Sequence, residues 1–208
     1  MTREYTDIRK VLKTGDLVLF SGKGKYSTLI RLMTGSDWTH VGMVLKLSEY
    51  DFIALWESII IGEVKTLSTG KKERGVQIVP LSNRIDMSRG KVAVRYVFGD
   101  YSNSLTNNRV ITRELMSLRK KLRGKPYEKS GIELFKAAFD APIIGSNEDD
   151  LSSIFCSELV AEAYKTLGLL KKDKPSNEFT PADFTSKKLT HLEKECCLSE
   201  EILIKKGC

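Results

Sequence analysis

The chain has 208 residues, of which 41% are hydrophobic and 29% are charged, and this composition is typical of an ordinary folded domain. It excludes a wholly disordered, collagenous or coiled-coil protein, and the length is enough for one domain with a substantial core. Lys and Arg outnumber Asp and Glu by 34 to 27, and the net charge of +7 favours anionic partners such as phospholipid, cell-wall polymer or nucleic acid.

The first half of the chain has the pattern of a sheet. Gly15-Asp16 leads into the apolar run Leu17–Phe20, which is typical of a buried strand, and from His40 onward apolar residues alternate as in a strand with one buried face. Further elements are predicted as a helix at Ser27–Met33 and strands at Phe52–Glu57, Ile59–Val64, Val76–Pro80 and Val92–Phe98. Because no long helix separates these strands, we expect the sheet to be antiparallel.

The second half of the chain changes to a helical period. Apolar residues recur at helical spacing over Val110–Leu122 and Leu159–Leu167, and each segment is followed by a glycine that can end a helix. A further helix is predicted at Ile132–Asp140. We therefore expect a single α+β domain over residues 1–208, with its core at about 14–186 and a C-terminal extension at 187–208.

The N-terminus and the cysteines bear on the compartment. The first residues mix acids with bases and precede no apolar block, so they do not resemble a signal peptide. Three of the four cysteines crowd near the C-terminus, unlike a disulfide framework, and we expect a cytoplasmic protein with peripheral membrane association left open. His191, Cys196, Cys197 and Cys208 lack the paired C-x2-C spacing of a zinc site, so we expect no metal and no cofactor.

Cys156 is the first candidate for chemistry. It lies at or near the start of the helix that includes Leu159 and Val160, where the helix dipole and unpaired N–H groups favour a thiolate. Its spacing from these two residues turns it toward the inside of the protein or toward a cleft. The same position suits an inert buried cysteine, so position alone leaves both interpretations open.

His40 and Glu57 are the second and third candidates, because each lies at the end of a predicted strand. If these strands pair, Glu57 could hold Nδ1–H of His40 while the other ring nitrogen faces Cys156. This is the arrangement of nucleophile, base and orienting group in thiol enzymes. Taken singly, the residues could also be an ordinary strand-end histidine and a surface glutamate.

An ordered set of short motifs extends from about Thr14 to Phe184, over most of the chain. Its members are Gly15–Phe20, Ser36–Val44, Glu57-Ser58, Gly75-Val76, Gly124–Tyr127, Phe155–Val160 and Pro181–Phe184. The set resembles the YiiX-like, circularly permuted NlpC-type papain-like proteins, whose permuted plan is shared by the relatives of lecithin:retinol acyltransferase. Permutation would explain why the histidine precedes the cysteine here.

The resemblance implies a permuted papain-like α+β fold, with an antiparallel, barrel-like sheet packed against helices and an active cleft between them. It implies that Cys156 is the nucleophile, His40 the base and Glu57 the orienting group. Tyr127 is then expected near the oxyanion, and Ser157 is the second residue expected at the substrate and oxyanion site. A core tyrosine with its hydroxyl at the surface is the alternative for Tyr127.

We therefore expect a thiol hydrolase that cleaves an amide bond, of peptide or peptidoglycan type, through an acyl-enzyme. A lipid acyl hydrolase or acyltransferase with the same triad is the enzymatic alternative, so the substrate is a small molecule, a peptide or a lipid. The second alternative is a noncatalytic module whose basic residues, such as Arg119–Arg123, hold an anionic membrane or a polyanion. No nucleic-acid-binding signature accompanies these residues, so nucleic acid is not an expected partner.

Overall fold

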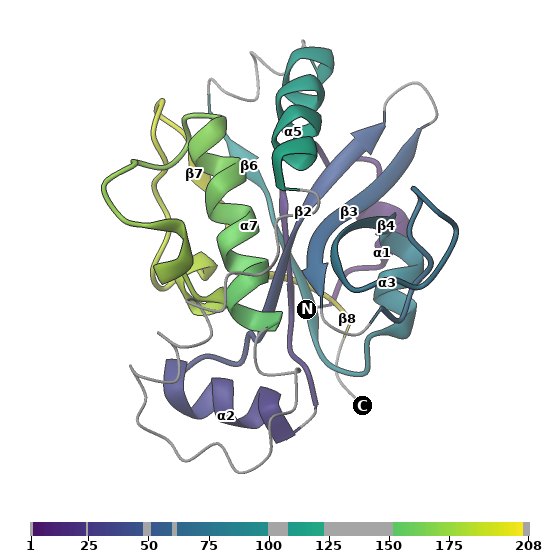
Figure 1. Cartoon of the computed structure of the whole chain (residues 1–208). Coiled ribbons are helices and arrows are strands. Elements are labelled where there is room, and N and C mark those ends of the chain that lie inside the picture. The colour runs from purple at the N-terminus through teal and green to yellow at the C-terminus, as the bar shows by residue number, and fades with distance from the viewer. Residues whose placement is uncertain are drawn as a thin grey trace.

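The computed structural model describes residues 2–23, 25–47, 51–59, 62–99, 108–122 and 152–205. Within these residues an open antiparallel sheet has the strand order β4-β3-β2-β1-β5-β8, with helices packed around it (Figure 1). Its strands are β1 (Leu17–Phe20), β2 (His40–Leu47), β3 (Phe52–Ile59), β4 (Gly75–Pro80), β5 (Val92–Arg95) and β8 (Ile202–Lys205). A smaller sheet pairs β6 (Val97–Phe98) with β7 (Cys197–Leu198).

The described helices surround this sheet. They are α1 (Tyr5–Ile8), α2 (Lys25–Thr34), α3 (Leu81–Met87), α5 (Asn108–Leu122) and α7 (Ser152–Thr166), together with the short 3-10 helices η4 (Ser176–Glu178) and η5 (Pro181–Phe184). The three helices predicted around Ser27–Met33, Val110–Leu122 and Leu159–Leu167 are thus confirmed as α2, α5 and α7. The helix predicted at Ile132–Asp140 lies outside the described residues. Among the helices in the described ranges, none combines the length and the hydrophobicity needed to cross a bilayer.

The predicted α+β class and antiparallel sheet are confirmed, but the barrel-like closure is wrong. β4 and β8 are the two edges of the described sheet and do not pair with each other. The strand predicted at Ile59–Val64 is also wrong, because β3 continues to Ile59 and residues 62–64 are not in a strand. At Gly62 an added Cβ would overlap the carbonyl oxygen of Glu73, so the chain lies there directly against other backbone. The papain-like plan stays a prediction.

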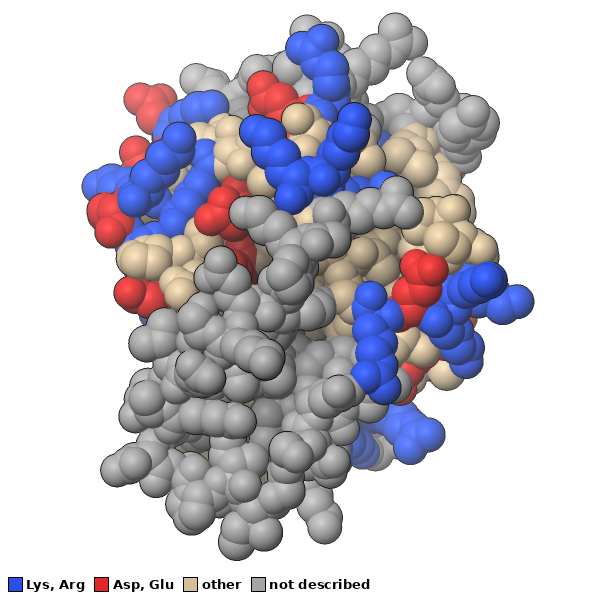
Figure 2. Space-filling view, in the orientation of Figure 1, with Lys and Arg blue, Asp and Glu red and all other residues tan. Residues whose placement is uncertain are grey.

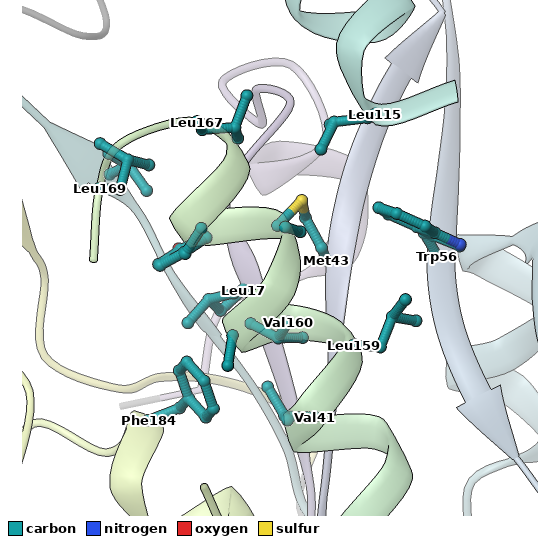
Figure 3. Packing of buried hydrophobic residues seen from close by; sticks show 14 of the residues in the cluster. Leu17, Val41, Met43, Trp56, Leu115, Leu159, Val160, Leu167, Leu169 and Phe184 are labelled. Carbon is teal, nitrogen blue, oxygen red and sulfur yellow. The ribbon is translucent and has the colours of Figure 1, made fainter. Parts of the chain in front are cut away.

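Both faces of the sheet are buried. On one face, Leu159 and Val160 of α7 pack with Met43 of β2 and Trp56 of β3 (Figure 3). On the other face, α1 and α3 contribute to a second hydrophobic cluster with alternate residues of the same strands. The alternation that begins at His40 predicted a single buried face, and the second face is buried because these two short helices cover it.

Two buried polar side chains fix the helices and the C-terminal segment to the sheet. The hydroxyl of Tyr164 on α7 donates to the carbonyl oxygen of Gly15, just before β1, over 2.8 Å. Arg95 on β5 is fully buried and donates to the carbonyl oxygens of Phe184 and Leu189 at 2.7 and 2.8 Å. The predicted C-terminal extension, residues 187–208, contributes strands β7 and β8 to the described fold.

Candidate active site

His40 and Glu57 come together because the strands that carry them pair. β2 begins at His40 and runs antiparallel to β3, with Met43 opposite Trp56. Nε2 of His40 lies 2.7 Å from Oε2 of Glu57, and the side chain of Glu57 has no exposed surface. A carboxylate bound to one ring nitrogen fixes the orientation of an imidazole and stabilises its charged form.

Cys156 lies in the second turn of α7, whose N-terminal end is at the same end of the sheet as the start of β2 (Figure 1). It is fully buried, and its thiol is hydrogen-bonded to the side chain of His40. Because Glu57 occupies Nε2, Nδ1 is the ring nitrogen left for the sulfur. The expectation that Glu57 would hold Nδ1 is therefore wrong, because Glu57 binds Nε2.

Two further side chains bind the carboxylate of Glu57, and sequence reasoning missed both. Gln77 lies opposite Glu57 in the pairing of β3 with β4 and donates from Nε2 to Oε1 over 2.9 Å. Arg84 on α3 donates from Nε to Oε1 and Oε2 at 3.2 and 3.1 Å. Arg84 shares the buried face of α3 with Leu81 and Ile85. An arginine at an apolar position of a helix is the sequence signal that indicates a buried charge pair.

The charges around the ring determine its protonation. Burial would raise the pKa of Glu57, but the positive charge of Arg84, the contact with His40 and the hydrogen bond from Gln77 lower it from 4.5 to about 2. Burial alone would lower the pKa of His40, but the charge and hydrogen bond of Cys156, followed by those of Glu57, raise it from 6.5 to about 9. At neutral pH Glu57 is therefore ionised and His40 carries two protons on its ring.

Known proteins show little similarity to this chain. No family model matches the chain, and no curated protein matches it. One similar solved structure is described as the metalloprotein YiiX from Escherichia coli O157:H7, with 23% sequence identity and a TM-score of 0.45 over 74% of this chain. The match spans 66% of the YiiX chain, just under two thirds of its length. Similarity at this level establishes neither a shared fold nor a shared activity.

Metal-ligating side chains do not cluster in the part of the chain that the structure describes. In these ranges, His, Cys, Asp and Glu side chains form no group of three or more that could hold a metal ion. The described site contains one thiol, one imidazole and one carboxylate, with an amide and a guanidinium bound to the carboxylate.

The two residues expected at the oxyanion site have different outcomes. Tyr127 lies outside the described residues. Ser157 is fully buried, and its hydroxyl donates to the carbonyl oxygen of Phe179, which follows η4. This bond connects the N-terminal half of α7 to the segment that follows η4. The role of Ser157 at an oxyanion stays a prediction.

A cavity of about 440 Å³ lies beside the start of β2. Its lining residues include Trp38, two residues before His40, and come mainly from the loop after α2 and from the segment after η5. Most of them carry hydroxyl, carboxylate or ammonium groups, among them Asp37, Lys187 and Glu201. The cavity lining does not include His40, Glu57 or Cys156, so this is a neighbouring space, and its wall is apolar and polar in equal parts.

Proposed function

We propose that this chain is a cysteine hydrolase that opens an amide bond through an acyl-enzyme on Cys156. One observation carries the proposal: a buried thiol is hydrogen-bonded to the side chain of a histidine whose Nε2 binds a buried carboxylate at 2.7 Å. A cysteine that only fills space needs no such partner. Three groups from α7, β2 and β3 in this order match the nucleophile, acid–base and orienting roles of thiol enzymes.

The resting site in this proposal is a thiolate paired with an imidazolium. The charge of Cys156 is the largest of the causes that raise the pKa of His40 to about 9, so the ring of this pair holds its second proton at neutral pH. Thiolate is the nucleophilic form of cysteine. His40 acts first as the acid, although its expected role from the sequence was that of the base.

The reaction has two balanced steps. The sulfur of Cys156 attacks the amide carbonyl, a C–S bond forms, and the C–N bond breaks as Nδ1 of His40 gives its proton to the departing amine. A water molecule then attacks the thioester, His40 takes one proton from it, and the C–S bond breaks to release a carboxylic acid. Backbone N–H groups near the start of α7 would stabilise the oxyanion in both steps.

The cavity beside Trp38 has as much apolar as polar wall, and its hydroxyl and charged side chains can bind the polar substituents of a peptide-like substrate. The lipid alternative has one observation in its favour. Lys and Arg side chains gather over α5, with acidic side chains among them, and Arg113, Lys120 and Lys121 of this helix are exposed (Figure 2). Such a surface suits anionic headgroups. The amide and lipid substrates share the same chemistry at Cys156, so a substrate panel separates them.

The test compares the alkylation of two buried thiols. Cys156 and Cys196 are 0% and 2% exposed, and the thiol of Cys196 donates to the carbonyl of Lys194 at 3.3 Å. With iodoacetamide at pH 7 and peptide-resolved mass spectrometry, Cys156 should react at least about tenfold faster than Cys196. His40→Gln should remove this advantage. Equal rates for the two thiols would mean that Cys156 is a packing residue and would end the proposal.

The substrate panel uses peptide p-nitroanilides and phosphatidylcholine vesicles with wild-type protein and the Cys156→Ser variant. We expect cysteine-dependent release of nitroaniline and no release of fatty acid. Fatty-acid release that depends on Cys156 would replace the amide substrate by the lipid one. Vesicle binding that survives in Cys156→Ser, with no turnover of either substrate by wild type, would favour the noncatalytic module.

A further inference from the structure

Four side chains, including the imidazole of His40, form a closed ring of contacts. His40 binds Glu57 at 2.7 Å, and Glu57 accepts hydrogen bonds from Arg84 at 3.1 and 3.2 Å. The guanidinium of Arg84 lies over the ring of Phe20, 4.6 Å from its centroid, and the rings of Phe20 and His40 are 5.5 Å apart. The four residues come from β2, β3, α3 and β1, so the ring of contacts spans elements far apart in the sequence.

Arg84 is the member of this ring that touches both neighbours of the imidazole. Its side chain is 9% exposed, and its other acidic contact is Glu63, at 3.8 Å and 45% exposed. A buried guanidinium needs a paired anion, and its planar shape lets it bind a carboxylate while stacking on an aromatic ring. Arg84 satisfies both conditions, with Glu57 as the anion and Phe20 as the ring.

We propose that Arg84 is a positioning residue for the pair formed by His40 and Cys156. It holds the imidazole through the carboxylate of Glu57 on one side and through the ring of Phe20 on the other, and so keeps Nδ1 directed at the sulfur. This inference rests on the proposed function of the site. Arg84 does not act on the substrate, because its two contacts with the site run through Glu57 and Phe20.

The charge of Arg84 gives this role a measurable signature. Arg84 and His40 both bind Oε2 of Glu57, at 3.1 and 2.7 Å, so the two cations lie within about 6 Å of each other. Arg84 therefore keeps Glu57 ionised while it offsets part of the attraction that Glu57 exerts on the imidazolium. Among the residues that the structure describes, the charged or titratable groups that face His40 are Cys156 from α7 and Glu57 from β3, with Arg84 behind Glu57. Glu63 contacts Arg84 on its exposed side.

The experiment is an NMR titration of the histidine rings, which is simple because the chain has two histidines. His191 is exposed and serves as the internal reference. In Arg84→Met, the pKa of His40 should rise by about one unit relative to wild type, because the positive charge that opposes the imidazolium is gone while Glu57 remains ionised above pH 7.

Kinetics on the same variants complete the test. Arg84→Met should lower kcat on the active amide substrate by about 10- to 100-fold with KM little changed, because the imidazole is less well placed. Arg84→Lys, which keeps the charge, should recover part of kcat and leave the pKa of His40 near its wild-type value. Phe20→Leu removes only the aromatic support, so it should lower kcat without moving that pKa. These two variants keep the inference testable if Arg84→Met does not fold.

The inference is overturned if folded Arg84→Met loses stability but leaves the pKa of His40 and kcat at their wild-type values. Its failure is distinct from failure of the proposed function. The titration needs no substrate. If the pKa of His40 shifts in Arg84→Met while Cys156 of the wild type never reacts, the hydrolase is refuted and the electrostatic link between Arg84 and His40 remains. Normal turnover by both Arg84 variants would refute the positioning role and leave the hydrolase.

Discussion

Replacing Glu57 by glutamine tests whether a buried carboxylate holds the site together. Its side chain is 0% exposed and binds His40, Gln77 and Arg84, so Glu57→Gln leaves the guanidinium of Arg84 without its buried anion. Breaking a buried charge pair in this way typically costs about 3–5 kcal/mol. We expect the free energy of unfolding at pH 7 to fall by that amount, as measured by urea denaturation monitored by circular dichroism.

The matched control is Glu63→Gln. Glu63 contacts the same guanidinium, but at 3.8 Å and with 45% of its side chain exposed, so its loss should cost less than about 1 kcal/mol. The double variant Glu57→Gln/Arg84→Met should recover part of the stability, because it also removes the unpaired cation. Equal losses in Glu57→Gln and Glu63→Gln would refute the reasoning.

The pH dependence of that loss follows from the pKa of Glu57. Because folding lowers this pKa from 4.5 to about 2, the stabilisation is complete above pH 4.5 and is lost as the pH falls through 2. The difference between wild type and Glu57→Gln should therefore stay constant from pH 7 to pH 5 and shrink only in stronger acid. A difference that disappears near pH 6 would contradict the lowered pKa.

Three further predictions concern single side chains. Folding raises the pKa of His40 from 6.5 to about 9. The contribution of His40 to the stability of the fold is therefore complete below pH 6.5 and is lost as the pH rises through 9. His40→Gln should remove that alkaline decline in Tm. Ser157→Ala removes the hydrogen bond to Phe179 and should cost about 1 kcal/mol in urea denaturation, with kcat reduced less than tenfold; a loss of 100-fold or more would make its hydroxyl an oxyanion donor. Trp38→Ala should raise KM for peptide amides while leaving the iodoacetamide rate of Cys156 unchanged, and an unchanged KM would exclude the neighbouring cavity from substrate binding.

Local patterns in the sequence predict the elements well because they depend on side-chain spacing within one segment. The apolar run at Leu17–Phe20 and the helical stripe after Cys156 both correspond to elements of the structure. The open sheet was not predictable in this way. β8 pairs with β5 from the far end of the chain, and no period within Ile202–Lys205 identifies that partner. A residue pattern reports which positions are apolar, and tertiary packing decides which strand lies beside which.

The candidate site was likewise predictable only in part. The ends of two predicted strands indicated that His40 and Glu57 could meet, since neighbouring strands bring their ends together. The ring nitrogen that faces each partner depends on the directions from which α7 and β3 approach, which the sequence does not contain. Arg84 was missed because its partner is 27 residues away and belongs to another element. Only its place among the apolar residues of α3 indicates burial.

The most direct measurement is the mass of the protein trapped during turnover. Wild type is mixed with a peptide thioester, quenched in acid within seconds, digested and analysed by mass spectrometry. The hydrolase predicts a mass increase equal to the acyl group on the peptide that contains Cys156, absent from Cys156→Ala and retained in Cys196→Ala. An acyl group found only on Cys196 or Cys197, or no adduct while the thioester is consumed at the same rate by Cys156→Ala, would contradict it.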